Sequence, residues 1–447
     1  MDKRETIESV VDAGLCTGCG TCVGICPIDA VEMNIDRRKG IYLPKVDKAK
    51  CTGCGLCFEA CPGHSVDFKS LNREIFGKEP DDILIGNYLR CYTGHATDYN
   101  IRYNSASGGL VTALLIFALE EGLIGGALVT RMSEENPLEP QPFIARTREE
   151  IIAASKSKYC PVPANIALKE ILQNEGKFAV VGLPCHIHGI RKAESLNKKL
   201  KEKIVLHIGI FCGHTPTFLA TDFVLQKFKV DKNNIKALDY RGQGWFGGMS
   251  IKLKGSNNRS IPYFDYWDKG FGLYFYPRRC SLCVDGTAEL ADISFGDAWL
   301  PKFKKDKIGT SILISRTRLA EETLQNKNLP TRIKIDQVAP QKIFQSQKSM
   351  LDFKKSTVRE GQTIVGIFGK KLPIYNLTLP RKRLIDYGCF GWISFYVENY
   401  LFSKKHMWKV IPLYLFLKRV AWNIPRNVAI RIFRKAGKLI RIWSIPQ

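Results

Sequence analysis

Two runs of four cysteines near the start of the chain have the spacing of iron–sulfur ligands. The first run is Cys16-x2-Cys19-x2-Cys22-x3-Cys26-Pro27, and the second is Cys51-x2-Cys54-x2-Cys57-x3-Cys61-Pro62. Three thiolates spaced two residues apart wrap one face of a four-iron cubane, while the fourth, turned away at the proline, reaches the neighbouring cluster. We therefore assign one [4Fe–4S] cluster to Cys16, Cys19, Cys22 and Cys61, and a second to Cys51, Cys54, Cys57 and Cys26.

Zinc sites and disulfides are the competing interpretations of these cysteines. Zinc sites built from Cys-x2-Cys pairs lack the third cysteine and the Cys-Pro, and a decayed ferredoxin lobe would lack some of the eight ligands. Disulfide frameworks belong to small secreted proteins, whereas this chain has 447 residues and an odd total of 15 cysteines. The first eleven residues carry charges of both signs and no apolar segment, so we expect no secretory signal and a cytoplasmic location.

Four further cysteines could hold a third [4Fe–4S] cluster. Cys185 and Cys212 follow predicted strands at 177–181 and 203–211, and Cys280 and Cys283 form a two-residue-spaced pair. If the two strands are parallel neighbours, their thiols emerge at the same carboxyl edge of the sheet, where α/β proteins bind ligands. Spacing alone leaves an alternative open, in which the first two are small buried hydrophobic residues and the pair is incidental.

Two polar segments could bind a phosphate or a flavin. Ser107, Gly108 and Gly109 precede a predicted helix at 110–122, with Ser107 as its N-cap, and the free N–H groups there could hold a pyrophosphate. The glycines could equally serve only close helix packing. Ser157, Lys158 and Tyr159 supply a hydroxyl, a cation and an aromatic ring, in a segment that could also be a solvated turn.

Six stretches in series resemble the coenzyme F420 hydrogenase/dehydrogenase beta-subunit family. They are residues 105–129, 157–163, 181–192, 208–214, 240–249 and 280–299. The resemblance implies an FAD-binding α/β fold with a [4Fe–4S] cluster beside the flavin, and coenzyme F420, a deazaflavin, as the hydride partner. It also implies that Cys185, Cys212, Cys280 and Cys283 ligate the third cluster, and that the FAD site is lined by Ser107, Gly108, Gly109, Ser157, Lys158, Tyr159, Gly182 and Pro184.

The expected fold is an α+β bacterial-type 2[4Fe–4S] ferredoxin module fused to an α/β flavin-binding domain, with a mainly helical basic C-terminal extension. We expect the ferredoxin domain at 1–72 and the N-terminal part of the beta-subunit region at 83–160. The C-terminal part of that region, with FAD and the third cluster, should occupy 161–345 and the basic aromatic extension 346–447. The sequence contains no run of about 18 apolar residues, so we expect no membrane-spanning helix.

The net charge of +24 is concentrated in the tail, because eleven Lys and Arg and no acidic residue follow Glu398. A basic, tryptophan-bearing segment suits peripheral contact with the inner face of the cell membrane. Packing on its own domain or on an acidic partner is the alternative. We expect no nucleic-acid partner, because no recognised binding motif accompanies the charge.

The combined features predict an iron–sulfur flavoprotein oxidoreductase that moves electrons between a hydride carrier, coenzyme F420 or similar, and one-electron carriers such as a redox partner protein or ferredoxin. The alternative is an electron-transfer subunit or a ferredoxin-dependent reductase of an unidentified substrate, in a polysaccharide-synthesis setting for some bacterial relatives. A scaffold that keeps its cofactors structurally is disfavoured by twelve plausible cluster thiols. His186, His214 and Lys158, with His188 and Asp297, are candidates for proton transfer, and structural hydrogen bonding suits each equally well.

Overall fold

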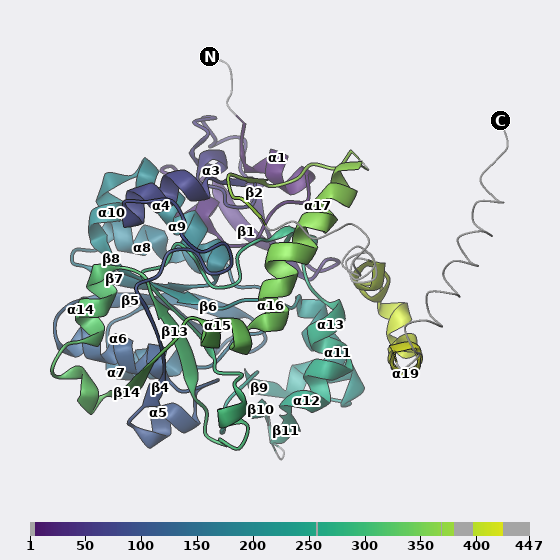
Figure 1. The fold of residues 1–447 in the computed structure, drawn as a ribbon. Helices are drawn as coiled ribbons and strands as arrows, with labels where there is room; N and C mark the ends of the chain where they lie inside the picture. Colours follow the sequence, from purple (N-terminus) through teal and green to yellow (C-terminus); the bar gives the residue numbers. More distant parts are fainter. Residues whose placement is uncertain (1–4, 256–257, 368, 380–396, 423–447) are drawn as a thin grey trace. The chain divides into compact units, whose positions relative to one another are not determined.

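The chain forms two compact units, residues 1–399 and 400–447. The computed structural model describes residues 5–255, 258–367, 369–379 and 397–422 (Figure 1). The ferredoxin module, the α/β region and residues 346–379 all belong to the first unit. The boundaries expected at residues 72, 160 and 345 remain predictions, since these regions pack together.

The ferredoxin module consists of short elements around two cysteine loops. Its elements are α1 (Ile7–Asp12), α2 (Thr21–Gly24), β1 (Val31–Asp36), β2 (Ile41–Val46), α3 (Leu56–Glu59), β3 (Ser65–Val66) and α4 (Phe68–Phe76). Each loop enters its short helix through a left-handed glycine, Gly20 at φ +84° or Gly55 at φ +80°, a conformation that strains other residues. Strands β1 and β2 pair antiparallel, with Val31 opposite Val46.

An eight-stranded mixed sheet forms the centre of the α/β region, in the order β14-β4-β13-β12-β8-β7-β5-β6. The strands are β4 (Arg90–Ala96), β5 (Gly126–Met132), β6 (Pro140–Ala145), β7 (Phe178–Gly182), β8 (Ile204–Ile210), β12 (Ile293–Asp297), β13 (Ser311–Ser315) and β14 (Ile333–Val338). The four central strands β12, β8, β7 and β5 run parallel, and the flanking pairs are antiparallel. Parallel strands require covered faces, and helices cover both.

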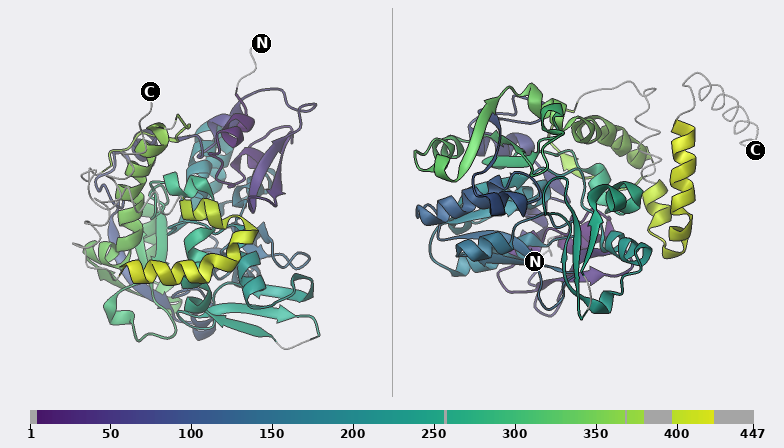
Figure 2. Two further views of the ribbon diagram at one scale, coloured as in Figure 1. Left: turned by 90° about the vertical axis from the view of Figure 1, so that its right-hand side faces the viewer. Right: turned by 90° about the horizontal axis from the view of Figure 1, so that it is seen from below.

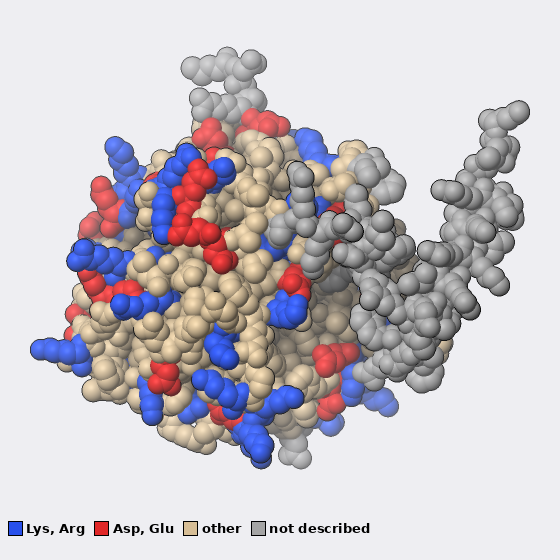
Figure 3. Space-filling view, in the orientation of Figure 1, with Lys and Arg blue, Asp and Glu red and all other residues tan. Residues whose placement is uncertain are grey.

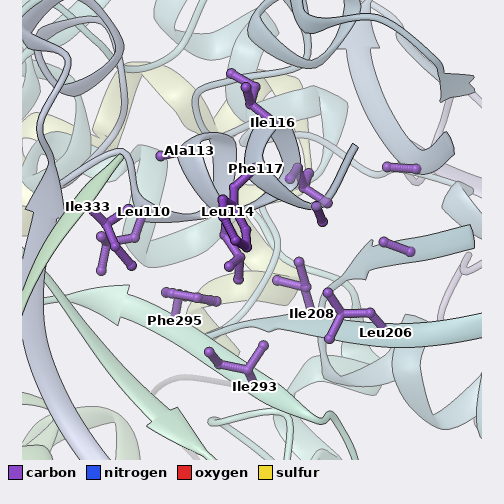
Figure 4. Packing of buried hydrophobic residues seen from close by; sticks show 14 of the residues in the cluster. Leu110, Ala113, Leu114, Ile116, Phe117, Leu206, Ile208, Ile293, Phe295 and Ile333 are labelled. Atoms are coloured by element: carbon purple, nitrogen blue, oxygen red, sulfur yellow. The ribbon is translucent and has the colours of Figure 1, made fainter. Parts of the chain in front are cut away.

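Two hydrophobic clusters flank this sheet because side chains alternate along each strand. One cluster joins α6 (Leu110–Glu120), whose Leu114 and Phe117 are buried, to Ile208 of β8 and Phe295 of β12 (Figure 4). The other joins Val180 of β7 to α9 (Pro184–Leu196) and α8 (Leu168–Gln173). The remaining helices of this region are α5 (Tyr99–Tyr103), α7 (Arg148–Ala153), α10 (Lys198–Lys203), α11 (Phe218–Lys227) and α14 (Arg318–Leu324).

The strands and the helix expected from the sequence are present, with one correction. The strands expected at 177–181 and 203–211 are β7 and β8, and they are parallel neighbours as required. The helix expected at 110–122 is α6, and Gly122 follows it at φ +69°. Ser107 is not the N-cap: Gly109 occupies that position in a left-handed conformation, and Ser107 donates its hydroxyl to the carbonyl of Thr310 instead.

The ferredoxin module packs against the side of the sheet that α8 and α9 cover, and the two parts approach each other very closely at two glycines. A Cβ at Gly24 would lie 2.1 Å from the Asn165 carbonyl, and one at Gly189 of α9 would lie 2.1 Å from Thr21 Oγ1. Phe68 and Val66 of the module belong to the same buried cluster as α8 and α9. The module is therefore built into the α/β region, and its position relative to β7 and α9 is fixed by packing.

Residues after 341 return to the ferredoxin module. Helices α15 (Gln341–Ser346), α16 (Lys348–Asp352) and α17 (Val358–Ile367), the last two joined by the π-helical turn η7 (Phe353–Thr357), lead to strand β15 (Ile374–Tyr375). Strand β15 pairs in parallel with β3 of the ferredoxin module. A small antiparallel sheet of β9 (Ile235–Asp239), β10 (Gly248–Leu253) and β11 (Arg259–Pro262), followed by α12 (Tyr263–Tyr266) and α13 (Gly272–Tyr274), completes this unit (Figures 1 and 2).

The described part of the second unit contains η8 (Lys405–Val410) and α19 (Ile411–Trp422), shown in yellow in Figure 2. Most of the predicted basic tail, residues 423–447, lies outside the described residues. None of the helices in the described ranges combines the length and apolar character of a bilayer-spanning segment. On the face of the molecule in Figure 3, Lys and Arg are interspersed with Asp and Glu.

Candidate metal centre

Cysteines of the two ferredoxin runs lie close to one another in the structure. Cys61, from the second run, lies close enough to Cys16 and Cys19 for their charges to interact, and burial together with these neighbours raises the pKa of Cys16 and Cys61. The pKa of Cys57 is likewise raised by burial and by the neighbouring thiols of its own group, Cys51, Cys54 and Cys26. The arrangement matches crosswise ligation, and the ligand roles remain predictions.

The four further cysteines line a single cavity. Cys185 is the second residue of α9, directly after β7, and Cys212 follows β8 by two residues. Cys280 and Cys283 come from η4 (Arg278–Leu282) and the residue after it. All four thiols line this cavity, as does Cys16 of the ferredoxin module. The parallel pairing of β7 and β8 therefore brings the first two thiols to the same edge of the sheet, where the loop pair meets them.

Burial and mutual charge make this group of thiols unfavourable as free thiolates. Burial raises the pKa of Cys185 and of Cys212, the latter to about 12, and in both cases the neighbouring thiols add to the effect. Among the described residues, no three His, Cys, Asp or Glu side chains converge on a position for a single metal ion. A four-iron cluster binds each thiolate through a different iron and so accepts more widely spaced ligands. Four thiols are the ligand set that a four-iron cluster takes.

Buried cations surround the cavity. Arg279 donates Nε to the carbonyl of Gly63 (3.1 Å) and Nη2 to the hydroxyl of Tyr375 (2.6 Å), and its Nη1 has no partner. Lys354 also lines the cavity, and the nearby thiols raise its pKa despite burial. Two buried positive side chains facing four thiols fit an anionic occupant, because an isolated buried charge is strongly unfavourable.

Asn165 joins the first ferredoxin cysteine loop to the helix that carries Cys185. It is fully buried; its backbone N–H donates to the carbonyl of Cys19 (2.9 Å), and its Nδ2 donates to Thr21 Oγ1 (2.8 Å) and the carbonyl of His186 (2.9 Å). The Thr21 hydroxyl in turn lies 3.2 Å from Cys19 Sγ. The charge of Cys19 also contributes to the raised pKa of Cys185. This link holds the first ferredoxin group beside the third set of thiols, and nothing in the local sequence around Asn165 indicates it.

Tyr159, one of the residues expected around a flavin, contacts the buried side chain of Arg241. Its Nη1 donates to the hydroxyl of Tyr159 (3.0 Å) and to Asp297 Oδ2 (3.1 Å), and its Nη2 donates to the carbonyl of Ala106, next to Ser107. The guanidinium also lies over the ring of Tyr263, 4.9 Å from its centroid. Arg241 is buried and its Nε has no protein partner, which fits an acceptor atom of a bound molecule. Arg241 lies in the 240–249 stretch but was not singled out from the sequence.

Other residues expected at the flavin site are engaged within the protein. Gly108 donates its N–H to Ser311 Oγ (2.9 Å), and a Cβ there would lie 2.6 Å from the Gly94 carbonyl, so close packing explains this glycine. Ser157 lies in the loop that contains Tyr159, and Gly109 lies next to Gly108. Neither residue makes a contact that identifies a ligand. Pro184 lines the thiol cavity, whereas Gly182 packs against His186, to whose Cβ an added Cβ would come within 2.6 Å.

The candidates for proton transfer mostly have structural partners. Lys158 Nζ donates to three backbone carbonyls at the end of α7, Ala154, Ser155 and Lys156, and burial lowers its pKa to about 7. His186 accepts from the Leu183 N–H at Nδ1, so its Nε2 donates to the Val162 carbonyl (2.9 Å), and burial lowers its pKa to about 4. The bonds of His186 join Leu183 and Val162, which both line the cavity.

Two other histidines lie beside the cysteines. His188 forms a buried pair with Asp285, with 2.8 Å between Nε2 and Oδ2. The His214 ring contacts the rings of Trp267 and Tyr276, and Tyr159 contacts the same Trp267 at 4.7 Å between centroids. A row of aromatic rings therefore runs from the Cys212 loop to the residues gathered at Arg241.

Comparison with known proteins covers most of the first unit. Residues 91–169 and 175–341 match the family models described as coenzyme F420 hydrogenase/dehydrogenase, beta subunit N-term and C terminus. Residues 15–65 match the 4Fe-4S dicluster domain. Residues beyond 341 fall outside these matches.

Similar proteins include hydrogenase subunits and a reductase. Coenzyme F420 hydrogenase subunit beta of Methanosarcina barkeri is 27% identical over 300 residues, covering 63% of this chain and 97% of the relative. Its counterpart in Methanothermobacter thermautotrophicus is 30% identical over 247 residues, covering 52% and 82%. Coenzyme F420-dependent sulfite reductase of Methanocaldococcus jannaschii is 27% identical over 346 residues, covering 74% of this chain and 49% of the relative.

A solved structure shares the fold. A chain of the F420-reducing [NiFe] hydrogenase complex from Methanosarcina barkeri superimposes with a TM-score of 0.52 at 23% identity. The match covers 66% of this chain and 98% of that chain. At this identity the likeness concerns the architecture alone.

Proposed function

Since the chain belongs to the coenzyme F420 hydrogenase/dehydrogenase beta-subunit family and carries a 4Fe–4S dicluster domain, we propose that it exchanges electrons between a hydride carrier, coenzyme F420 or a similar compound, and one-electron carriers, through FAD and [4Fe–4S] clusters. The observation that carries this proposal is the cavity in which Cys185, Cys212, Cys280 and Cys283 lie together beside the ferredoxin thiols. Such a cavity supports a third cluster in line with the two ferredoxin clusters.

The order of the thiol groups supports a continuous path for electrons. Cys16 lines the cavity of the third group, and Cys19 is linked through Thr21 and Asn165 to α9, so the first ferredoxin cluster would adjoin the third. Cys54, in the second ferredoxin group, is exposed. A partner protein or ferredoxin would then exchange electrons at this exposed end of the path.

Arg241 and its neighbours are the residues best suited to hold FAD. Arg241 would bind the cofactor through its unpaired Nε, while Tyr159 and Asp297 fix the guanidinium in place. When bound, a flavin supplies the exchange between two-electron hydride chemistry and one-electron transfer. The aromatic rings of Tyr159, Trp267 and Tyr263 contact one another beside Arg241.

The function is tested with purified, oxygen-free protein, reduced coenzyme F420 and a dye acceptor. We expect the chain alone to reduce the dye, since it contains both the proposed hydride-accepting site and the clusters. Protein that fails with reduced coenzyme F420 but accepts electrons from reduced ferredoxin would support the alternative, a ferredoxin-dependent reductase. Failure with both donors by fully loaded protein would contradict an autonomous oxidoreductase and favour an electron-transfer subunit that needs its partner.

Changing Cys283 to Ser should remove one cluster and leave the other two. Parent protein should contain about twelve irons per chain, from three four-iron clusters, and the Cys283→Ser variant about eight. Iron and acid-labile sulfide analysis of oxygen-free preparations measures this change. Cys160→Ser is the matched control, because Cys160 is a buried cysteine that lies outside the three groups, and it should keep all its iron. Equal iron in parent and Cys283→Ser would contradict the third cluster.

We also propose that the second unit contacts the surface of an anionic membrane. Helix α19 exposes Leu413 and Leu417, which are four residues apart and so lie on one face. Lys404, Lys405 and Lys409 precede this helix in the sequence. Basic residues beside exposed apolar ones are typical of interfacial helices.

Vesicle sedimentation tests this contact. Parent protein should pellet with anionic vesicles but not with vesicles of neutral phosphatidylcholine, because the lysines require the negative surface. The double variant Leu413→Glu, Leu417→Glu should remain in the supernatant with both. Parent protein that never pellets, or a double variant that pellets as well as the parent, would show that this helix has another role.

A further inference from the structure

The C-terminal part of the first unit contributes a buried lysine to the proposed third cluster. The family match ends at residue 341, yet η7 (Phe353–Thr357) inserts Lys354 into the lining of the thiol cavity. This residue is only 1% exposed. π-Helical turns of this kind are uncommon and frequently occur at functional sites.

Lys354 is directed at the cysteines. Its ammonium lies 3.4 Å from the carbonyl of Cys280, and Cys283, Cys212 and Cys280 are the nearby groups with which its charge interacts most strongly. Within the described ranges, no carboxylate lies within ion-pair distance of Lys354. Asp285, whose charge also acts on Lys354, is already held by His188 Nε2 and by the backbone N–H groups of Thr287 and Glu289.

The neighbouring residue shows what a buried lysine ordinarily requires. Lys355 is also fully buried, but it forms an ion pair with the buried carboxylate of Glu289. A buried ammonium with no such partner is strongly unfavourable, so Lys354 requires a different anion in its surroundings. Four thiolates holding an iron–sulfur cluster are the anion that this cavity offers.

We propose that Lys354 sets the reduction potential of the [4Fe–4S] cluster bound by Cys185, Cys212, Cys280 and Cys283, by stabilising its reduced form. Accepting one electron makes the cluster and its thiolates one unit more negative, with no bond formed or broken and no proton transferred. A fixed positive charge in a low-dielectric site favours this form over the oxidised one. The inference rests on the third cluster proposed above and extends it to a residue outside the family match.

This role makes Lys354 a positioning and tuning residue, since it acts through the cluster. It gives the third cluster a higher potential than the same four thiols would produce alone. Electrons that arrive singly from a flavin or from the ferredoxin clusters would then populate this cluster more readily. A second buried cation, Arg279, donates to the carbonyls of Pro62 and Gly63 and so lies between this cavity and the ferredoxin module.

Redox titration monitored by EPR spectroscopy tests the proposal in the full-length protein loaded with clusters. In Lys354→Met, which keeps the volume and removes the charge, we expect the reduction equilibrium of one cluster to fall at least tenfold, or about 59 mV for one electron. The affected signal should be the one that Cys283→Ser lacks. Lys354→Arg, which keeps the charge, should titrate like the parent, and so should Lys348→Met, a control in the preceding helix whose side chain is exposed.

The iron content of Lys354→Met and Lys354→Arg is measured alongside the potentials and distinguishes the remaining outcomes. Loss of about four irons in Lys354→Met, with full iron in Lys354→Arg, would overturn the proposal, because the charge would then retain the cluster instead of setting its potential. Full iron with unchanged potentials in Lys354→Met overturns it, and so does equal loss of iron in both variants, which would indicate a steric role. If Lys354→Met does not fold, Lys354→Gln carries the same expectations, and failure of both neutral variants to fold assigns Lys354 to structure instead.

The iron content of the parent protein distinguishes a failure of this inference from a failure of the proposed function. About eight irons in the parent would remove the third cluster and with it the basis of the inference. About twelve irons with an unshifted potential in Lys354→Met would remove the role of Lys354 and leave the proposed function intact.

Discussion

Buried thiolates that lie close together require positive charge among them, and the thiol cavity of the first unit provides buried cations beside its cysteines. As free thiolates the cysteines would repel one another in a poorly solvated interior, and burial accordingly raises the pKa of Cys185, Cys212 and Cys280. An iron–sulfur cluster bound there, as proposed, would meet part of this requirement through its metal. The buried side chains of Lys354 and Arg279, which come from η7 and η4, meet another part.

The fold supplies the positions that this chemistry needs. Parallel pairing of β7 and β8 delivers Cys185 and Cys212 to one sheet edge, and the loop at η4 adds Cys280 and Cys283. Asn165 and the glycine contacts hold the ferredoxin module close enough for Cys16 to reach the same cavity. Strand β15 then ties residues after η7 back to β3, so that the ferredoxin module and the C-terminal segment close around the thiols together.

The cysteines of the site could be predicted from the sequence because they follow fixed spacings or come soon after predicted strands. The eight ferredoxin cysteines follow fixed spacings, and β7 and β8 are short, largely apolar runs that end three residues before Cys185 and two residues before Cys212. The roles of Asn165, Arg241 and Lys354 could not be predicted in this way, because each depends on partners more than fifty residues distant. The prediction that Ser107 caps α6 is wrong because the Ser107 hydroxyl donates to the carbonyl of the distant Thr310. Gly109 is the N-cap of this helix.

The central claim is that three clusters lie in sequence, with the third set of thiols beside the first ferredoxin group. EPR spectroscopy of the fully reduced, oxygen-free protein, with the spins counted, tests this claim most directly. The account predicts about three spins per chain, with signals broadened by magnetic coupling between adjacent clusters. About two spins per chain, or three sharp and uncoupled signals, would contradict it.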